Sequence, residues 1–331
     1  MLLRGGLLRG GLMGVAFLVA GLMASLFAFA ETRALEGGRH DYAVVTSQGS
    51  STLSLIDRER HGVVAEIAVP LSPAGVAVAG RYAYIASTKA RAITQWDLWQ
   101  RRLVARRDMA SEPLGIAVHK DKLAVAMWYD GEVMILDAHD LTIESVIKVG
   151  VEPAGVDFKA DGAMLYVSNR GDDSLSVIHM GMMKEIERVP VGDAPFGVTI
   201  DDEGRYIYVA NVRSHSVSVV EAESYRLRGH IAVGSRPYAI AVERGGRRAF
   251  VTNQDEGSIS VIDGEAMAER QRVHVGGYPE GIELDEERGL MYVANWLDDE
   301  VILMDVKGLR VDRRIAVGEG VRAFGRFLTW Q

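Results

Sequence analysis

The sequence predicts an all-β fold, a seven-bladed β-propeller of four-stranded antiparallel blades, because one motif recurs seven times in phase. The residue that closes a Ser-Val-Ile-Asp-like run recurs with spacings of 40, 40, 42, 42, 42 and 42 residues, at Asp57, Asp97, Asp137, His179, Glu221, Asp263 and Asp305. A second landmark gives the same count, at Pro73, Pro113, Pro153, Pro195, Pro237, Pro279 and, in the same slot, Val321. A period of about 40–45 residues with short strands is typical of propeller blades.

Each repeat is expected to hold four strands, bounded by Gly, Asp or Pro. In one repeat these are an innermost strand Tyr238–Glu243, a second strand Ala249–Asn253, a third strand Ser258–Asp263 and an outermost strand Gln271–Val275. The turns between them contain glycine, aspartate or proline, which are the usual turn residues.

A small residue lies two positions after each proline landmark, at Gly75, Gly115, Gly155, Gly197, Ala239, Gly281 and Ala323. Blades converge toward the axis of a propeller, so the innermost strands must approach one another closely. Glycine and alanine permit that approach.

The repeats also predict how the ring closes. The repeated region starts with a second strand near Tyr42–Ser47 and finishes with an innermost strand, Val321–Trp330. We expect these two segments to pair and complete one blade, which hides strand edges that would otherwise template aggregation. Deletion of residues 321–331 should therefore open the ring.

The first 40 residues have a different character. Arg4 and Arg9 precede an uncharged apolar run, and the small residues Ala28 and Ala30 end it. This pattern predicts a signal peptide over residues 1–30, a short flexible arm over 31–40 and a propeller over 41–331, hence a secreted or periplasmic protein. The alternative is an uncleaved membrane anchor, although the run is short for a spanning helix.

Composition excludes several kinds of chemistry. The chain has no cysteine, which rules out disulfides, thiolate metal sites and covalent c-type haem. Loss of the two leader arginines takes the formal charge from −8 to −10. A mildly acidic body disfavours nucleic acid as a partner.

Four second strands carry a recognisable motif, at Tyr166–Asn169, Tyr208–Asn211, Phe250–Asn253 and Tyr292–Asn295. The motif resembles the YVTN repeat, and the whole mature chain resembles YncE-like bacterial periplasmic seven-bladed propellers. The resemblance implies the fold and export. It also allows an accessory role beside a periplasmic redox enzyme, and single-stranded nucleic-acid binding is known among such proteins. The first three copies depart from the motif, with Ser47, Ser87 and Met127 in the asparagine slot.

Two sets of loops should share one mouth of the channel: those that precede the innermost strands and those that follow the second strands. Their large or charged residues form the predicted ligand- or partner-binding site, which comprises Trp128, Arg170, Phe196, Arg236, Tyr238, Glu280, Trp296 and Arg322. Other repeats place alanine or threonine in these slots, so packing alone does not require them. Exposed Trp, Tyr and Arg commonly anchor partners. The alternative is that these side chains plug the channel mouth or pack between blades.

Other polar residues have simpler explanations. We expect the four motif asparagines to hydrogen-bond their own loop backbones, and the strand-closing aspartates to cap turns. His215 is interpreted as a hydrogen-bonding residue of its loop.

Asp157 and Glu283 are less easily explained, because they replace small residues of the innermost strands. Together with Glu112, Glu152 and Glu280 they raise the possibility of a divalent-metal site. No catalytic triad, phosphate loop or dinucleotide motif is present.

The sequence therefore favours a monomeric, non-catalytic binding or scaffold protein with a protein or small-molecule partner. It predicts no catalytic residue, no metal and no cofactor, and no stable membrane insertion after leader cleavage. The alternatives are a metal-dependent lactonase or lyase, and an accessory subunit of a periplasmic redox enzyme.

Overall fold

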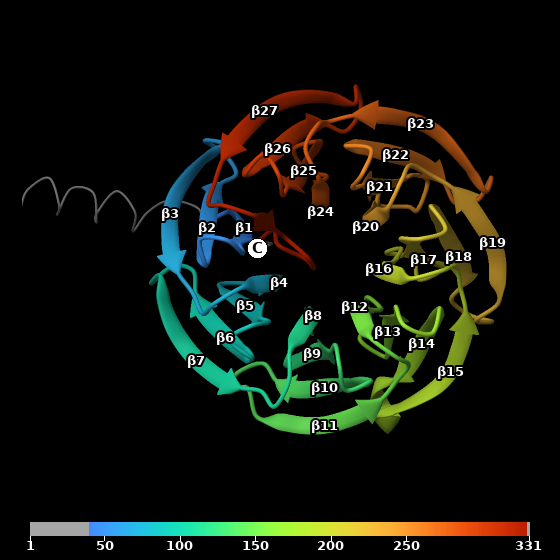
Figure 1. Ribbon diagram of the computed structural model, residues 1–331, viewed down its shortest axis with the longest axis horizontal. Coiled ribbons are helices and arrows are strands. Elements are labelled where there is room, and N and C mark those ends of the chain that lie inside the picture. The colour runs from blue at the N-terminus through green and yellow to red at the C-terminus, as the bar shows by residue number, and fades with distance from the viewer. Residues whose placement is uncertain (1–39, 330–331) are drawn as a thin grey trace, which may run out of the picture. The chain divides into compact units, whose positions relative to one another are not determined.

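The computed structural model describes residues 40–329, which form a ring of seven four-stranded antiparallel sheets (Figure 1). The predicted signal peptide and most of the predicted arm lie outside the described residues. Within residues 40–329, no helix has the length and apolar character needed to cross a bilayer.

The four strand positions repeat regularly around the ring. The innermost strands are β4 (Pro73–Ala79), β8 (Pro113–His119), β12 (Pro153–Phe158), β16 (Pro195–Ile200), β20 (Pro237–Val242), β24 (Pro279–Asp285) and β28 (Val321–Arg322). The second strands are β1 (Tyr42–Ser47), β5 (Tyr82–Ser87), β9 (Lys122–Met127), β13 (Met164–Asn169), β17 (Tyr206–Asn211), β21 (Ala249–Asn253) and β25 (Leu290–Asn295).

The third strands are β2 (Thr52–Asp57), β6 (Ala92–Asp97), β10 (Glu132–Asp137), β14 (Ser174–His179), β18 (Ser216–Glu221), β22 (Ser258–Asp263) and β26 (Glu300–Asp305). The outermost strands are β3 (Gly62–Ala68), β7 (Arg102–Asp108), β11 (Ile143–Lys148), β15 (Lys184–Pro190), β19 (Leu227–Ala232), β23 (Ala268–His274) and β27 (Arg310–Ala316). One 3-10 turn, η1 (Met180–Met182), separates β14 from β15.

Two of the predicted strands have other boundaries in the structure. The innermost strand expected at Tyr238–Glu243 is β20, Pro237–Val242. The outermost strand expected at Gln271–Val275 is β23, Ala268–His274, which begins where Ala268 pairs with Asp263. Its first residues were missed because an outermost strand is largely exposed, so no apolar alternation marks where it starts.

The small-residue slot has the predicted function. A Cβ on Gly75, Gly155, Gly197 or Gly281 would approach the backbone carbonyl of the next innermost strand far more closely than van der Waals contact allows. The apolar residues of each blade pack against those of its neighbours, as when Tyr208 and Val219 of one blade share a cluster with Ile240 and Val251 of the next. The core is therefore distributed between blades, and the narrow axis is left to the innermost strands.

Three of the four motif asparagines act differently from the prediction, whereas Asn295 Oδ1 accepts from the backbone N–H of Tyr278, in a neighbouring loop, at 2.6 Å. The Asn211 amide donates to Ser216 Oγ at 3.1 Å and to Ser218 Oγ at 2.9 Å, so it bonds side chains of the third strand rather than its own loop backbone. Asn169 and Asn253 make the equivalent pairs of bonds. The aspartates cap turns as expected: Asp57 Oδ1 accepts from the backbone N–H of Glu59 and Arg60.

The C-terminal segment closes the ring as predicted, but not as one continuous strand. Val321 and Arg322 pair with Ser47 and Thr46 of β1. The chain then crosses toward β4, where Val76 and Val78 donate to the carbonyls of Phe324 and Arg326 at 3.0 and 2.9 Å.

After the crossing, the chain returns to β1. There Val44 donates to the carbonyl of Phe327 at 2.8 Å, and Leu328 forms an antiparallel β-bridge with Ala43. The detour depends on Gly325, which has φ +130°; a Cβ there would collide with the carbonyl of Val76. The segment Phe324–Arg326, called the crossing segment below, therefore lies in the channel (Figure 1). Trp330, the last residue of the predicted strand, lies outside the described residues.

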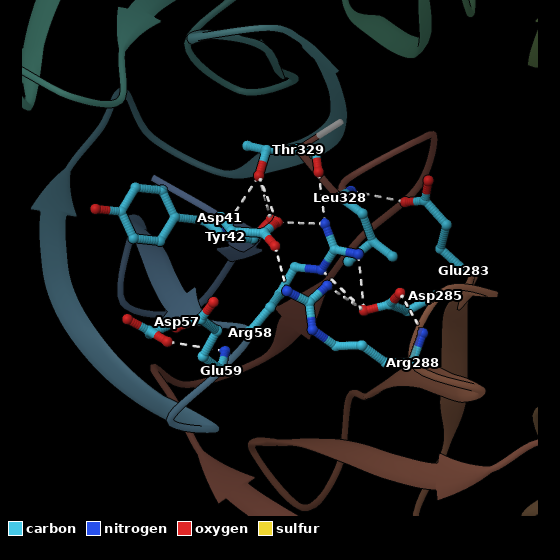
Figure 2. A network of polar contacts seen from close by, with 10 residues as sticks. All are labelled: Asp41, Tyr42, Asp57, Arg58, Glu59, Glu283, Asp285, Arg288, Leu328 and Thr329. Carbon is cyan, nitrogen blue, oxygen red and sulfur yellow. Dashed lines mark hydrogen bonds and ion pairs between the residues drawn. The ribbon is translucent and has the colours of Figure 1, made fainter. Parts of the chain in front are cut away.

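A buried ionic network fastens this closure (Figure 2). The Arg58 guanidinium reaches Asp41 Oδ1 and the carbonyl of Thr329, each at 2.5 Å, and Asp285 Oδ2 at 2.7 Å. Arg288 adds a contact of 2.5 Å to Asp41 and one of 3.0 Å to Asp285. The network joins the first blade, the last blade and the C-terminal segment.

Candidate functional site

The two faces of the ring are distinct because every innermost strand runs in the same direction. One face, here called the proline face, carries the loops that precede the innermost strands and the loops that follow the second strands. It is the face on which the binding site was predicted. The opposite face carries the loops between innermost and second strands.

An aromatic cluster closes the channel at the proline face. The rings of Phe196 and Tyr238 stack with centroids 4.2 Å apart, and Phe324 of the crossing segment lies 4.9 Å from Phe196 and 5.8 Å from Tyr238. These three side chains, the aromatic plug, are each less than a tenth exposed. Two of the predicted site residues, Phe196 and Tyr238, therefore plug the channel mouth, as the alternative interpretation expected.

A buried ion pair lies beside the plug. Glu280, which is 3% exposed, approaches Arg322 Nε at 3.1 Å and accepts a hydrogen bond from Gln254 Nε2 at 3.0 Å. Burial raises the pKa of Glu280 to about 7, and Arg322 only partly opposes that rise. Burial also raises the pKa of Tyr238.

Trp128 and Arg170 extend the cluster toward solvent. The Arg170 guanidinium lies 5.6 Å from the centroid of the Trp128 ring and 2.9 Å from Glu152 Oε2. Trp128 in turn lies 6.2 Å from Phe196. Six of the eight predicted residues therefore form one contiguous chain of contacts, from Arg170 through the plug to Glu280.

Trp296 and Arg236 lie outside that chain. Trp296 packs against Tyr278 at a centroid distance of 5.9 Å, and the exposed Arg236 lies 3.6 Å from Asp255. The backbone N–H of Arg236 donates to His215 Nδ1 at 3.1 Å, which confirms His215 as a hydrogen-bonding residue of this region.

The prediction missed the most exposed apolar residues of this face. Leu71, Tyr129, Val151 and Leu297 are 58%, 69%, 55% and 60% exposed. Tyr129 and Leu297 directly follow the predicted Trp128 and Trp296, while Leu71 and Val151 lie two residues before a proline landmark. A search of one more residue after the second strands would have found Tyr129 and Leu297, whereas finding Leu71 and Val151 requires reading two residues back from the proline.

The channel is open on the opposite face, where it forms a cavity of 440 Å³. Asp157 and Glu283 both line it, together with Phe324 and Arg326. Asp157 Oδ2 accepts from the backbone N–H of Ile200 at 3.2 Å and lies 3.6 Å from Arg326 Nη2. Glu283 Oε2 accepts from the backbone N–H groups of Phe327 at 2.5 Å and Leu328 at 2.8 Å.

The carboxylates considered for a metal site do not lie together. Asp157 and Glu283 line the open cavity, whereas Glu280 lies beyond the plug and Glu152 is paired with Arg170. Across residues 40–329 no group of three His, Asp or Glu side chains is placed to hold a metal ion.

Comparisons with known families agree on the class of fold. A model of the lactonase family, described as a seven-bladed beta-propeller, matches residues 124–228, and a model of the cytochrome D1 heme domain matches residues 38–153. Each covers less than half of the chain. Together with the seven sheets, they place this chain among the seven-bladed β-propellers. No curated protein matches its sequence significantly.

Similar solved structures extend over most of the chain. A functionally unknown protein from Desulfotomaculum acetoxidans has a TM-score of 0.76 at 12% identity, covering 85% of this chain and 98% of its own. Hydrazine synthase from Kuenenia stuttgartiensis has a TM-score of 0.71 at 15% identity, covering 80% and 95%. The dihydro-heme d1 dehydrogenase NirN has a TM-score of 0.65 at 16% identity, covering 85% and 74%. At these identities the likeness establishes the fold alone.

Proposed function

We propose that this protein is a non-catalytic binding protein that docks a protein partner on its proline face. The observation that carries the proposal is the combination of a closed channel mouth with exposed apolar side chains around it. Because the aromatic plug blocks entry, a ligand on this face must bind across the surface rather than inside the channel.

The composition of the face supports a macromolecular partner. Tyr129 and Leu297 stand out from the surface next to Trp128 and Trp296, with Arg170 and Arg236 nearby. Aromatic and arginine side chains dominate the binding energy of protein interfaces, and clustered exposed apolar residues mark such interfaces. The plug holds the loops that bear them on a rigid base, which lowers the entropic cost of binding.

The proposed compartment is the periplasm, which rests on the leader-like residues 1–30. As a second candidate, we propose that the chain is an accessory subunit of a redox enzyme in that compartment. Its support is the partial match to the cytochrome D1 heme domain and the similarity to hydrazine synthase and NirN.

A bound tetrapyrrole, which the heme-domain match would suggest, does not fit the channel of this chain. Phe324 closes one end and Arg326 occupies part of the remaining cavity. No step involving haem is therefore assigned to it.

Site-specific photo-crosslinking tests the docking face. A photoreactive phenylalanine analogue would replace Tyr129 or Leu297 in the full-length chain, produced in its native host with its own leader. The matched control is Trp99, which is 48% exposed on the opposite face.

We expect Tyr129 and Leu297 to give the same crosslinked protein and Trp99 not to give it. That adduct should disappear when Leu71 and Val151 are both changed to serine. No adduct, or the same adducts from both faces, would rule out this docking surface.

A further inference from the structure

The open end of the channel is a separate site from the docking face. Its cavity of 440 Å³ has the size of a small-molecule site, with Phe324 as its inner wall. Much of the remaining wall is small and apolar, including Ala77, Ala117 and Ala241. These residues occupy the slot in which other blades place Asp157 and Glu283.

Acidic groups outnumber basic ones around this cavity. Four carboxylates line it, from Asp157, Asp202, Glu283 and Glu286, whereas the arginines are Arg244 and Arg326. Arg244 is already placed 3.2 Å from Glu286 and 3.9 Å from Asp202. His119, which also lines the cavity, has its pKa lowered mainly by burial, which favours its neutral form. A concave site with low-dielectric walls and excess negative charge concentrates cations.

A guanidinium of the chain itself already lines this cavity. The Arg326 guanidinium projects from the crossing segment into the cavity, 3.6 Å from Asp157, while its carbonyl is held by Val78 at 2.9 Å. Its side chain remains 56% exposed, so it does not fill the space. Asp157 is only 10% exposed on strand β12, and burial raises its pKa while the charge of Arg326 opposes that rise. A buried carboxylate therefore faces a guanidinium that is more than half exposed, across a contact of 3.6 Å.

We propose that the open end of the channel binds a small organic cation, an alkylammonium or alkylguanidinium, with Asp157 as its counter-ion and Arg326 as its built-in competitor. The short alkyl part would pack on the alanine-lined wall. Removal of the Arg326 charge should then free Asp157 and strengthen binding, whereas removal of the Asp157 charge should weaken it. This cation site is separate from the docking face, so an experiment can reject either proposal without affecting the other.

Titration calorimetry on the mature chain tests the proposal with propylguanidinium and butylammonium as probes. Butyrate and butanol are matched probes with opposite and no charge. We expect the wild-type protein to bind both cations and neither control probe. Arg326→Gln should bind the cations at least tenfold more tightly, and Asp157→Asn at least tenfold more weakly.

The control variant is Arg226→Gln, which removes a surface charge. The Arg226 side chain is 78% exposed and does not line the cavity. It should leave binding unchanged. If Asp157→Asn proves unstable, Asp202→Asn at the exposed rim should still weaken cation binding about threefold through its field. Equal binding of butanol and the cations, no binding of either cation, or an unchanged affinity in Arg326→Gln would overturn the assignment.

Discussion

Arg58 Nη2 lies 2.7 Å from Asp285 Oδ2, and this contact joins the first blade to the last. Both side chains are almost completely buried, at 2% and 0% exposure. The same guanidinium also holds the carbonyl of Thr329, so the two ends of the ring and the C-terminal segment depend on one cation (Figure 2). Ring closure therefore combines a short strand pairing with a desolvated ionic network.

Arg58→Met should destabilise the fold by about 3–5 kcal/mol, because it leaves the buried carboxylates of Asp41 and Asp285 without their main counter-ion. Urea unfolding followed by circular dichroism measures the change. Arg60→Met is the control, since Arg60 is an exposed residue of the same loop. A loss below about 1 kcal/mol in Arg58→Met would show that the network contributes little to closure.

Gly197→Ala should cost about 3 kcal/mol, because its methyl group would collide with the backbone carbonyl of Tyr238 on the neighbouring innermost strand. A backbone atom cannot move away as a flexible side chain can. Gly62→Ala is the control, since a Cβ at Gly62 meets nothing within 4 Å. Thermal unfolding of the two variants should separate them by many degrees, and similar midpoints would contradict the close-approach argument.

These features differ in how far the sequence could reveal them. The ring and the glycine slot were predictable because each repeat offers an independent copy of the same constraint. The crossing segment was not, because Phe324, Gly325 and Arg326 follow the one innermost strand that is shortened to two residues. Its glycine occupies the slot of Ala77 and Asp157, and nothing in the repeat pattern marks that the backbone leaves the strand there.

The predicted site shows the same limit. The loop positions of Trp128 and Tyr238 followed from the repeat register, and the structure places both on the proline face. Register cannot tell whether a side chain at such a position turns inward or outward. Tyr238 turns into the plug, whereas Tyr129, one residue after the predicted Trp128 in a loop of the other set, faces solvent.

Asn211→Ala should lower the free energy of unfolding by about 1–3 kcal/mol, because it removes hydrogen bonds to Ser216 and Ser218 between the second and third strands. Gly192 packs directly against the same amide. A Cβ atom added to Gly192 would lie only 2.6 Å from Asn211 Cγ. Asn211→Ser should recover part of the loss, since serine fills the equivalent slot at Ser47 and Ser87. Chemical denaturation measures both variants, and an Asn211→Ala protein as stable as the wild type would exclude a structural role for the motif asparagine.

Glu280 should make the stability of the ring depend on pH. Its pKa is about 7 in the folded protein against an ordinary value of 4.5, so the folded state retains the proton over a range in which the unfolded chain has lost it. The free energy of unfolding should therefore fall as pH rises from about 4.5 to about 7, and then level off. A pKa shift of this size corresponds to a loss of roughly 3 kcal/mol in the free energy of unfolding over that pH range. Other groups titrate in the same range, so the wild-type curve alone does not isolate this carboxyl.

The comparison with Glu280→Gln does isolate it, because the amide cannot ionise but can still accept the hydrogen bond from Gln254. We expect the stability of the wild type relative to this variant to decrease by roughly 3 kcal/mol between pH 4.5 and pH 8, in urea titrations at matched ionic strength. Parallel stability curves for the two proteins would mean that Glu280 is ionised throughout this range and that Arg322 fully offsets the cost of its burial.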